Sequence, residues 1–246
     1  MRHLLRCLPV QLSPKFCLNA ILLKDSCTTV TGLAQSAYSV DFTKGSDLNN
    51  WRIVSGNVSY TSAGAEFTIN KQGDGPGLET PWFFLFGRLE VKLKAASGVG
   101  IASTVTLESD DFDEVTWEWL GGKTSEVLTS YSANKDANAA HSVSAPQSTS
   151  HTYAIDWSKE AISWFIDGAL IRTVNAADVS RGGSFPQTPM RVSLDIWAPG
   201  DPRNSQGSID FAGGVVDYKK GPFTFTVESV SVTNANPAAS YTYGDQ

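Results

Sequence analysis

Hydrophobic and polar residues alternate with a period of two through short runs along most of the chain. The runs are rich in Val, Ile, Thr, Phe and Trp, and Gly, Pro, Asn and Asp interrupt them about every ten residues. Clear examples are residues 64–69, 87–94, 153–157, 162–166 and 191–197. Helical periodicity extends no further than one turn near 175–179. Because period-two alternation is typical of strands that bury one face, the pattern predicts an all-β chain.

One connection between two of these runs carries a specific turn signal. Asp167-Gly168 separates the apolar runs 162–166 and 170–172. This dipeptide predicts a β-hairpin, because Gly accepts the positive φ that a tight hairpin turn requires. Short strands at this spacing pack as two antiparallel sheets face to face. We therefore expect a β-sandwich in which one concave sheet forms a cleft.

The turn residues between the runs also predict how the chain is organised. Residues 1–35 form a leader and an N-terminal segment, 36–234 the sandwich domain, and 235–246 a polar tail. At 246 residues the chain is long enough to build one large β domain with a sizeable core. We see no repeats and no long linker, and we expect a monomer.

Charge and composition narrow the classes of partner. The net charge is −6, from 25 acidic and 19 basic residues, and no basic block occurs. Nucleic acid is therefore not an expected partner, because phosphate binding needs clustered positive charge. The longest apolar patch, 82–86, is the size of a strand and cannot span a bilayer. Three His residues without ligand spacing predict neither a catalytic metal nor a cofactor, and structural calcium stays open.

The run from Asp113 to Gly122, DEVTWEWLGG, is the most informative stretch of the chain. As a strand it places Glu114, Thr116 and Glu118 on one face, and Val115, Trp117 and Trp119 on the other. A glycosidase needs two such carboxylates, one beside the anomeric carbon and one to protonate the leaving oxygen. The alternative is an ordinary half-buried strand with a solvated acidic face.

Glu-x-Asp-x-Glu on a strand is the signature of glycoside hydrolase family sixteen. The run DEVTWEWLGG resembles the fungal Crh-like branch of that family, cell-wall transglycosylases that join chitin to β-glucan. Stretches such as YSVDFTKG and HTYAIDWSKEAISWFIDG agree, and the resemblance runs from about residue 38 to residue 232. It implies a concanavalin-like jelly-roll sandwich with the carboxylates on its concave face. The chain departs from the motif at Thr116, where the family carries Asp.

The family motif assigns roles to the residues that match it. Glu114 corresponds to the nucleophile and Glu118 to the general acid/base. Thr116 can donate a hydrogen bond to Glu114, but it lacks the charge that would hold Glu118 protonated. We expect a loss on the order of 10²–10⁴ in rate from this change. On a flat strand the two Glu Cα atoms stand roughly 13 Å apart, so the pair needs a curved sheet to act together.

Candidate substrate-binding residues follow in a later strand and beyond it. Arg191, Asp195 and Trp197 share one face of the strand 191–197. Trp197 resembles the sugar-stacking Trp of the branch, with core packing as its alternative. Phe211 stands where relatives carry a second aromatic residue, and Ser208 is a nearby hydroxyl donor. Asp195, where relatives tend to have a small residue, either replaces the missing carboxylate or marks a different ligand.

The expected location of the protein depends on weaker signals. The resemblance implies a disulfide between Cys17 and Cys27, with Cys7 left over, and Asn57-Val58-Ser59 is a glycosylation sequon. The first 24 residues form a poor secretory signal, because Pro and Lys interrupt the apolar stretch. The polar C-terminus carries no signal for a GPI anchor. We expect secretion or a cell-wall location, with an intracellular one as the alternative.

The sequence is compatible with three functions. The first is a retaining glycosidase or transglycosylase on fungal cell-wall polysaccharide, chitin or β-glucan, weakened by the loss of the helper Asp. The second is a catalytically inactive module that binds glycans on the same face. The third is a glycosidase scaffold that serves an unrelated small-molecule reaction.

Overall fold

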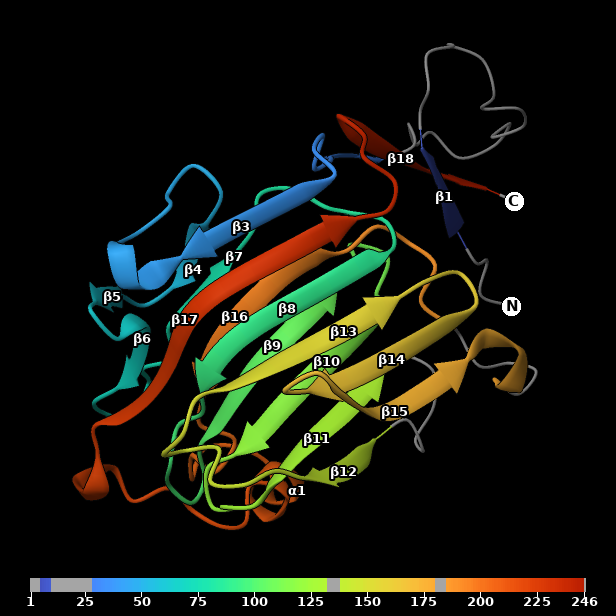
Figure 1. Cartoon of the computed structure of the whole chain (residues 1–246). Helices are drawn as coiled ribbons and strands as arrows, with labels where there is room; N and C mark the ends of the chain where they lie inside the picture. The colour runs from blue at the N-terminus through green and yellow to red at the C-terminus, as the bar shows by residue number, and fades with distance from the viewer. Residues whose placement is uncertain (1–4, 10–27, 132–137, 180–184, 246) are drawn as a thin grey trace.

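The computed structural model describes residues 5–9, 28–131, 138–179 and 185–245. Its regular structure is almost entirely strand (Figure 1). The strands are β1 Leu5–Pro9, β2 Thr29–Thr31, β3 Ala37–Asp41, β4 Arg52–Ser55, β5 Val58–Thr61, β6 Gly64–Ile69, β7 Gly77–Glu79, β8 Gly87–Lys94, β9 Ala102–Glu108, β10 Glu114–Leu120, β11 Glu126–Tyr131, β12 Ala139–Ser142, β13 His151–Trp157, β14 Ala161–Ile166, β15 Ala169–Asn175, β16 Arg191–Trp197, β17 Phe223–Asn234 and β18 Ser240–Asp245. The helices are η1 Phe42–Lys44, η2 Ala176–Asp178, α1 Gln206–Phe211 and η3 Tyr218–Lys220.

Two large antiparallel sheets form the layers of the molecule. One has the strand order β12-β11-β10-β9-β16-β7-β4, and the other β15-β14-β13-β8-β17-β6-β5, with β3 also paired to β17. Figure 1 shows the second sheet lying over the first. Consecutive strands often lie in different sheets, as β8 and β9 do, so the chain crosses between layers repeatedly. The predicted all-β jelly-roll sandwich is confirmed.

The local patterns locate several strands accurately. The runs 64–69, 87–94 and 191–197 coincide with β6, β8 and β16. Asp167 and Gly168 both have positive φ, 49° and 80°, and they join β14 to β15 in the predicted hairpin. The helical turn expected near 175–179 is η2. The sequence pattern did not predict α1, which is only six residues long.

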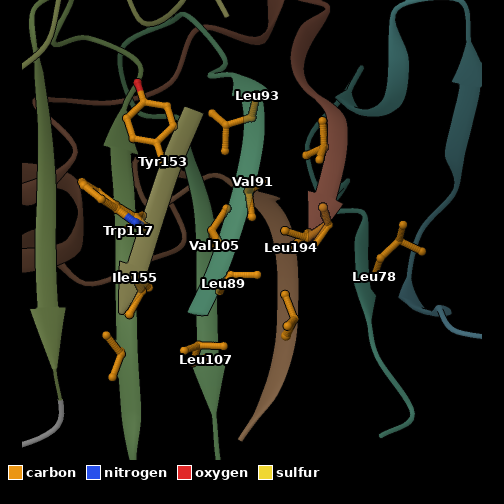
Figure 2. Packing of buried hydrophobic residues seen from close by; sticks show 14 of the residues in the cluster. Leu78, Leu89, Val91, Leu93, Val105, Leu107, Trp117, Tyr153, Ile155 and Leu194 are labelled. Carbon is orange, nitrogen blue, oxygen red and sulfur yellow. The ribbon is translucent and has the colours of Figure 1, made fainter. Parts of the chain in front are cut away.

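The core lies between the two sheets. Figure 2 shows Leu89 and Val91 of β8 facing Val105 and Leu107 of β9 across the layers. All four side chains are almost fully buried. Burial of apolar surface stabilises a fold by roughly 25 cal/mol per Å². Most of this stabilisation therefore comes from the layer between the two sheets. This packing leaves the other face of each sheet free for polar residues.

Strands also occur outside the span predicted for the sandwich. The segment 235–246, expected to be a polar tail, contains β18, which pairs with β1 and β2 in a three-stranded sheet. Tyr241 and Tyr243 of β18 are buried, which ties this sheet to the core. Cys17 and Cys27, and with them the expected disulfide, lie outside the described residues. Among the helices that the structure describes, none has the length and apolar character to cross a membrane.

Candidate active site

Strand β10 lies inside the seven-stranded sheet, paired on one side with β9 and on the other with β11. Val115, Trp117 and Trp119 point into the core, and each is at most 1% exposed. The rings of both Trp residues contact Tyr153 of the opposite sheet, at centroid distances of 5.2 and 4.6 Å. The alternation therefore holds, and residues 114, 116 and 118 lie on the outer face of the sheet.

Both ends of β10 are held by the backbone around them. At its start, the buried carboxylate of Asp113 accepts hydrogen bonds from Gln187 N, Thr188 N and Thr188 Oγ1 at 2.7–2.9 Å. At its end, Gly121 N donates to Ile101 O and Gly98 N donates to Gly121 O. A Cβ on Gly121 would lie 2.5 Å from Gly98 O, so this close approach requires glycine. The register of the Glu residues is thus fixed from both sides.

Three cross-strand rows bring distant residues together on this outer face. Neighbouring strands in a sheet lie about 4.8 Å apart, so the members of a row are side-chain neighbours. The rows are Glu118–Thr104–Asp195–Gly77, Thr116–Thr106–Ser193–Glu79 and Glu114–Glu108–Arg191. Glu114, Thr116, Glu118, Asp195 and Arg191, all singled out from the sequence, therefore share one face of the sheet.

Thr116 contacts the candidate nucleophile directly. Its hydroxyl donates a hydrogen bond of 2.8 Å to Glu114 Oε1. Thr116 is buried, whereas Glu114 is exposed at the start of the strand. The bond can orient the carboxylate of Glu114, but a neutral hydroxyl adds no charge near Glu118. Thr116 thus supplies one of the two effects expected of an Asp at this position.

Glu118 is half-buried, and its carboxyl titrates near neutrality. Burial raises its pKa to about 7, and the negative charges of Asp195 and Glu114 add to the increase. A hydrogen bond from Trp197 acts in the opposite direction. A group with this pKa can both donate and accept a proton near pH 7, which is what general acid/base catalysis requires.

Asp195 is the second carboxyl with a raised pKa on this face. Burial raises its pKa to about 6, the Thr104 hydroxyl lowers it, and the charges of Glu108 and Glu114 raise it. The Thr104 hydroxyl forms no hydrogen bond of normal geometry among the described residues, although it lies near enough to influence Asp195. The side chain of Asp195 keeps partial access to solvent.

Arg191 is already engaged by carboxylates at the Glu114 end of the face. Its Nε lies 2.9 Å from Glu108 Oε1 and 3.3 Å from Glu79 Oε2, and its Nη1 lies 2.9 Å from Asp110 Oδ1. The sequence reasoning missed Glu79, Glu108 and Thr104. The alternation in 102–108, which places Thr104, Thr106 and Glu108 on one face, is the signal that could have found the last two.

The remaining substrate-binding candidates lie near the other end of the face. Trp197 ends β16 and is 38% exposed, so its ring is accessible. Ser208 and Phe211 belong to α1, where Ser208 exchanges a hydrogen bond with the capping Ser205 and Phe211 is 39% exposed. The α1 segment reaches the same end of the sheet through a hydrogen bond from Gly100 N to Ala212 O. Within the described ranges, no group of three or more His, Cys, Asp or Glu side chains could hold a metal ion.

A β-sandwich whose sheet carries two carboxyl groups on one accessible face, one of them protonatable near neutrality, has the features of a carbohydrate-active enzyme. Comparison with known families agrees. The model of the glycosyl hydrolases family 16 matches residues 46–213, and the chain belongs to this family.

Individual relatives place the chain near one branch of the family. It is 50% identical over 228 residues to Crh-like protein 5 of Aspergillus fumigatus and 48% identical over 226 residues to Crh-like protein 1 of the same organism. These alignments cover 91% and 90% of this chain, which spans 58% and 63% of the lengths of the two relatives.

Solved structures agree with the fold. A Crh5 transglycosylase in complex with NAG superimposes with a TM-score of 0.86 at 49% identity, covering 90% of this chain and 93% of that one. A β-glucanase of Bacillus licheniformis, at 20% identity and a TM-score of 0.64 over 86% of this chain and 99% of that one, shares the fold. The family and branch indicated by the DEVTWEWLGG motif are confirmed.

Proposed function

We propose that the chain is a retaining transglycosylase that acts on cell-wall polysaccharide, chitin or β-glucan, with its active site on the outer face of the seven-stranded sheet. The observation that carries the proposal is Glu118, a carboxyl with a pKa of about 7 that shares a face of β10 with Glu114. Support for the substrate class comes from the 49% identical Crh5 transglycosylase solved with NAG.

The first chemical step cleaves the donor polysaccharide. The carboxylate of Glu114 attacks the anomeric carbon and forms a glycosyl ester while the glycosidic C–O bond breaks. Glu118 donates its proton to the departing sugar oxygen. The hydrogen bond from Thr116 holds Glu114 in orientation for the attack.

The second step releases the glycosyl group to an acceptor. Glu118, now a carboxylate, takes the proton from an acceptor hydroxyl, whose oxygen attacks the anomeric carbon and frees Glu114. A sugar hydroxyl gives transglycosylation, and water gives hydrolysis. Trp197, with Phe211 and Ser208 toward the same end of the sheet, would bind sugar rings there, because exposed aromatic faces suit neutral sugars.

The second candidate function is glycan binding without turnover. It is favoured by Thr116, which offers Glu114 a hydrogen bond but leaves β10 without a third carboxylate. For either function we propose a secreted or cell-wall location, since the polysaccharide is found there.

The test incubates the purified chain with unlabelled chitin oligosaccharide as donor and fluorescently labelled chito- and gluco-oligosaccharides as acceptors. Mass spectrometry distinguishes longer labelled products, which show transfer, from shorter ones, which show hydrolysis. We expect transfer in the wild type and a loss of roughly 10²–10⁴ in Glu118→Gln. Calorimetric binding without product in the wild type would select the binding module, and neither binding nor product would overturn both.

A further inference from the structure

We propose that Asp195 is the third carboxylate of the site, a positioning residue that acts on Glu118 from across β9 instead of along β10. The proposal rests on the proposed function for its catalytic meaning. Its structural basis is the row Glu118–Thr104–Asp195, in which Thr104 is the single residue between the two carboxyl groups.

The row places small groups on both sides of Asp195. On its far side Asp195 pairs with Gly77, which has no side chain, and a Cβ there would lie 3.4 Å from the Cβ of Asp195. On its near side the Thr104 hydroxyl is buried and forms no hydrogen bond of normal geometry in the described part of the chain. The space between the two acids is thus occupied by one small polar group.

The charged groups around this row do not neutralise Asp195. Arg191 lies on the same strand but forms its ion pairs with Glu79, Glu108 and Asp110. The other groups that act on Asp195 are the acids Glu108 and Glu114. Strand β11, on the opposite side of Glu118, contributes Leu128, which has no charge. Among the described residues, the ion pairs of this face involve neither Glu118 nor Asp195.

The charge of Asp195 suits the role. Burial raises the pKa of Asp195 to about 6 and that of Glu118 to about 7. An ionised Asp195 favours the protonated form of Glu118, which is the form that a general acid needs. Asp195 is the larger of the two charge effects on Glu118, ahead of Glu114. It thereby supplies the charge that Thr116 cannot.

The experiment compares the wild type with Asp195→Asn in the full chain. The first readout is the pH at which the Glu118 carboxyl titrates, followed by carbon-13 NMR of Glu-labelled protein and assigned by its absence in Glu118→Gln. We expect Asp195→Asn to lower this pKa by about one unit, which corresponds to a tenfold change in protonation equilibrium. An unchanged titration of Glu118 would overturn the proposal, whether or not the protein turns over sugar.

The second readout is the pH profile of transglycosylation of the labelled oligosaccharides. Asp195→Asn should move the alkaline limb of kcat to lower pH, with about fivefold loss at pH 7 and about tenfold loss above pH 8. Thr116→Asp added to Asp195→Asn should restore the limb, because it places a charge beside Glu118 by another route. Asp156→Asn, on the outer face of the other sheet, is the matched control and should change neither readout. If Asp195→Asn shifts the titration of Glu118 but the wild type shows no turnover, the proposed function is contradicted and the electrostatic role of Asp195 remains.

Discussion

The outer faces of the two sheets treat acidic residues differently. On the eight-stranded sheet Asp156 and Glu228 are paired with bases: Arg88 Nη1 lies 2.8 Å from Asp156 Oδ1, and Lys92 Nζ lies 2.7 Å from Glu228 Oε2. Although burial alone would raise the pKa of Glu228, hydrogen bonds from Lys92 and Ser150 hold it below its usual value. On the seven-stranded sheet, Glu118 and Asp195 have raised pKa values.

This difference supports the active site that we propose on the seven-stranded face. The lowered pKa of Glu228 keeps its carboxyl ionised near neutral pH, where it does not donate a proton. A half-buried acid beside other acids is held protonated at some cost in stability, and such costs are typical of functional sites. The eight-stranded face thus pairs Asp156 and Glu228 with bases, whereas the seven-stranded face, which also carries the ion pairs of Arg191, holds Glu118 and Asp195 with raised pKa values.

The largest expected effect is on the seven-stranded face. Glu114→Gln should lower transglycosylation by on the order of 10⁴ or more, because the amide cannot form the glycosyl ester. The assay is the rate of formation of longer labelled oligosaccharides, with circular dichroism to verify folding. Glu228→Gln, on the other face, is the control and should retain wild-type turnover. A Glu114→Gln protein within tenfold of wild type would remove Glu114 from the nucleophile position.

The two faces should respond to pH with opposite signs. The pKa of Glu118 is about 7 in the folded protein against a usual value of 4.5, so Glu118 stabilises the fold below about pH 4.5 and that contribution disappears as pH rises through 7. For Glu228, whose pKa is lowered, the contribution is present above about pH 4.5 and disappears as pH falls.

Urea unfolding at pH 5 and pH 8 measures this contrast. The free energy of unfolding of the wild type should fall between pH 5 and pH 8. We expect this fall to be roughly 1–2 kcal/mol smaller in Glu118→Gln, after allowance for partial solvent screening. A mutant whose pH dependence equals that of the wild type would contradict the raised pKa of Glu118. Glu228→Gln serves as the reference variant, since it should change the pH dependence of the free energy of unfolding only below pH 5.

Adding an acid to the seven-stranded face should increase activity. Thr116→Asp is expected to raise turnover by less than about twofold at pH 7 and by up to about tenfold above pH 8, because the new charge raises the pKa of Glu118 from about 7 by about one unit. The gain is smaller than the full contribution of a helper acid if Asp195 already provides part of that charge. Thr116→Asn, with the same shape and no charge, is the matched control. A folded Thr116→Asp protein with no gain in kcat would show that Thr116 does not limit the reaction.

The smallest effect is expected on the paired face. Lys92→Met should cost at most about 1 kcal/mol of unfolding free energy, because exposed ion pairs contribute little in water. Turnover should stay at the wild-type level. A loss of several kcal/mol in urea unfolding would mean that this pair supports the sandwich and that the two faces differ less than we infer.

The alternation of apolar and polar residues predicted much of the fold. Residues 191–197 coincide with β16, and Trp117 and Trp119 lie in the core as their positions in DEVTWEWLGG require. These predictions hold because the side-chain period of a strand is a property of the backbone alone, so residues two apart must share a face. The helix α1 was missed because six residues are too few to show a helical period.

The sequence by itself determined that Glu114, Thr116 and Glu118 share a face, that Asp167-Gly168 turns a hairpin, and that the chain belongs to its family. Only the tertiary structure decided that Asp195 lies in the row of Glu118 and that Arg191 is held by Glu79 and Glu108. Strands β10 and β16 are separated by about 70 residues, and Glu118 and Asp195 share a row because both strands pair with β9. Period-two alternation says which face a residue occupies, whereas the neighbours that set its pKa come from strands far away in the chain.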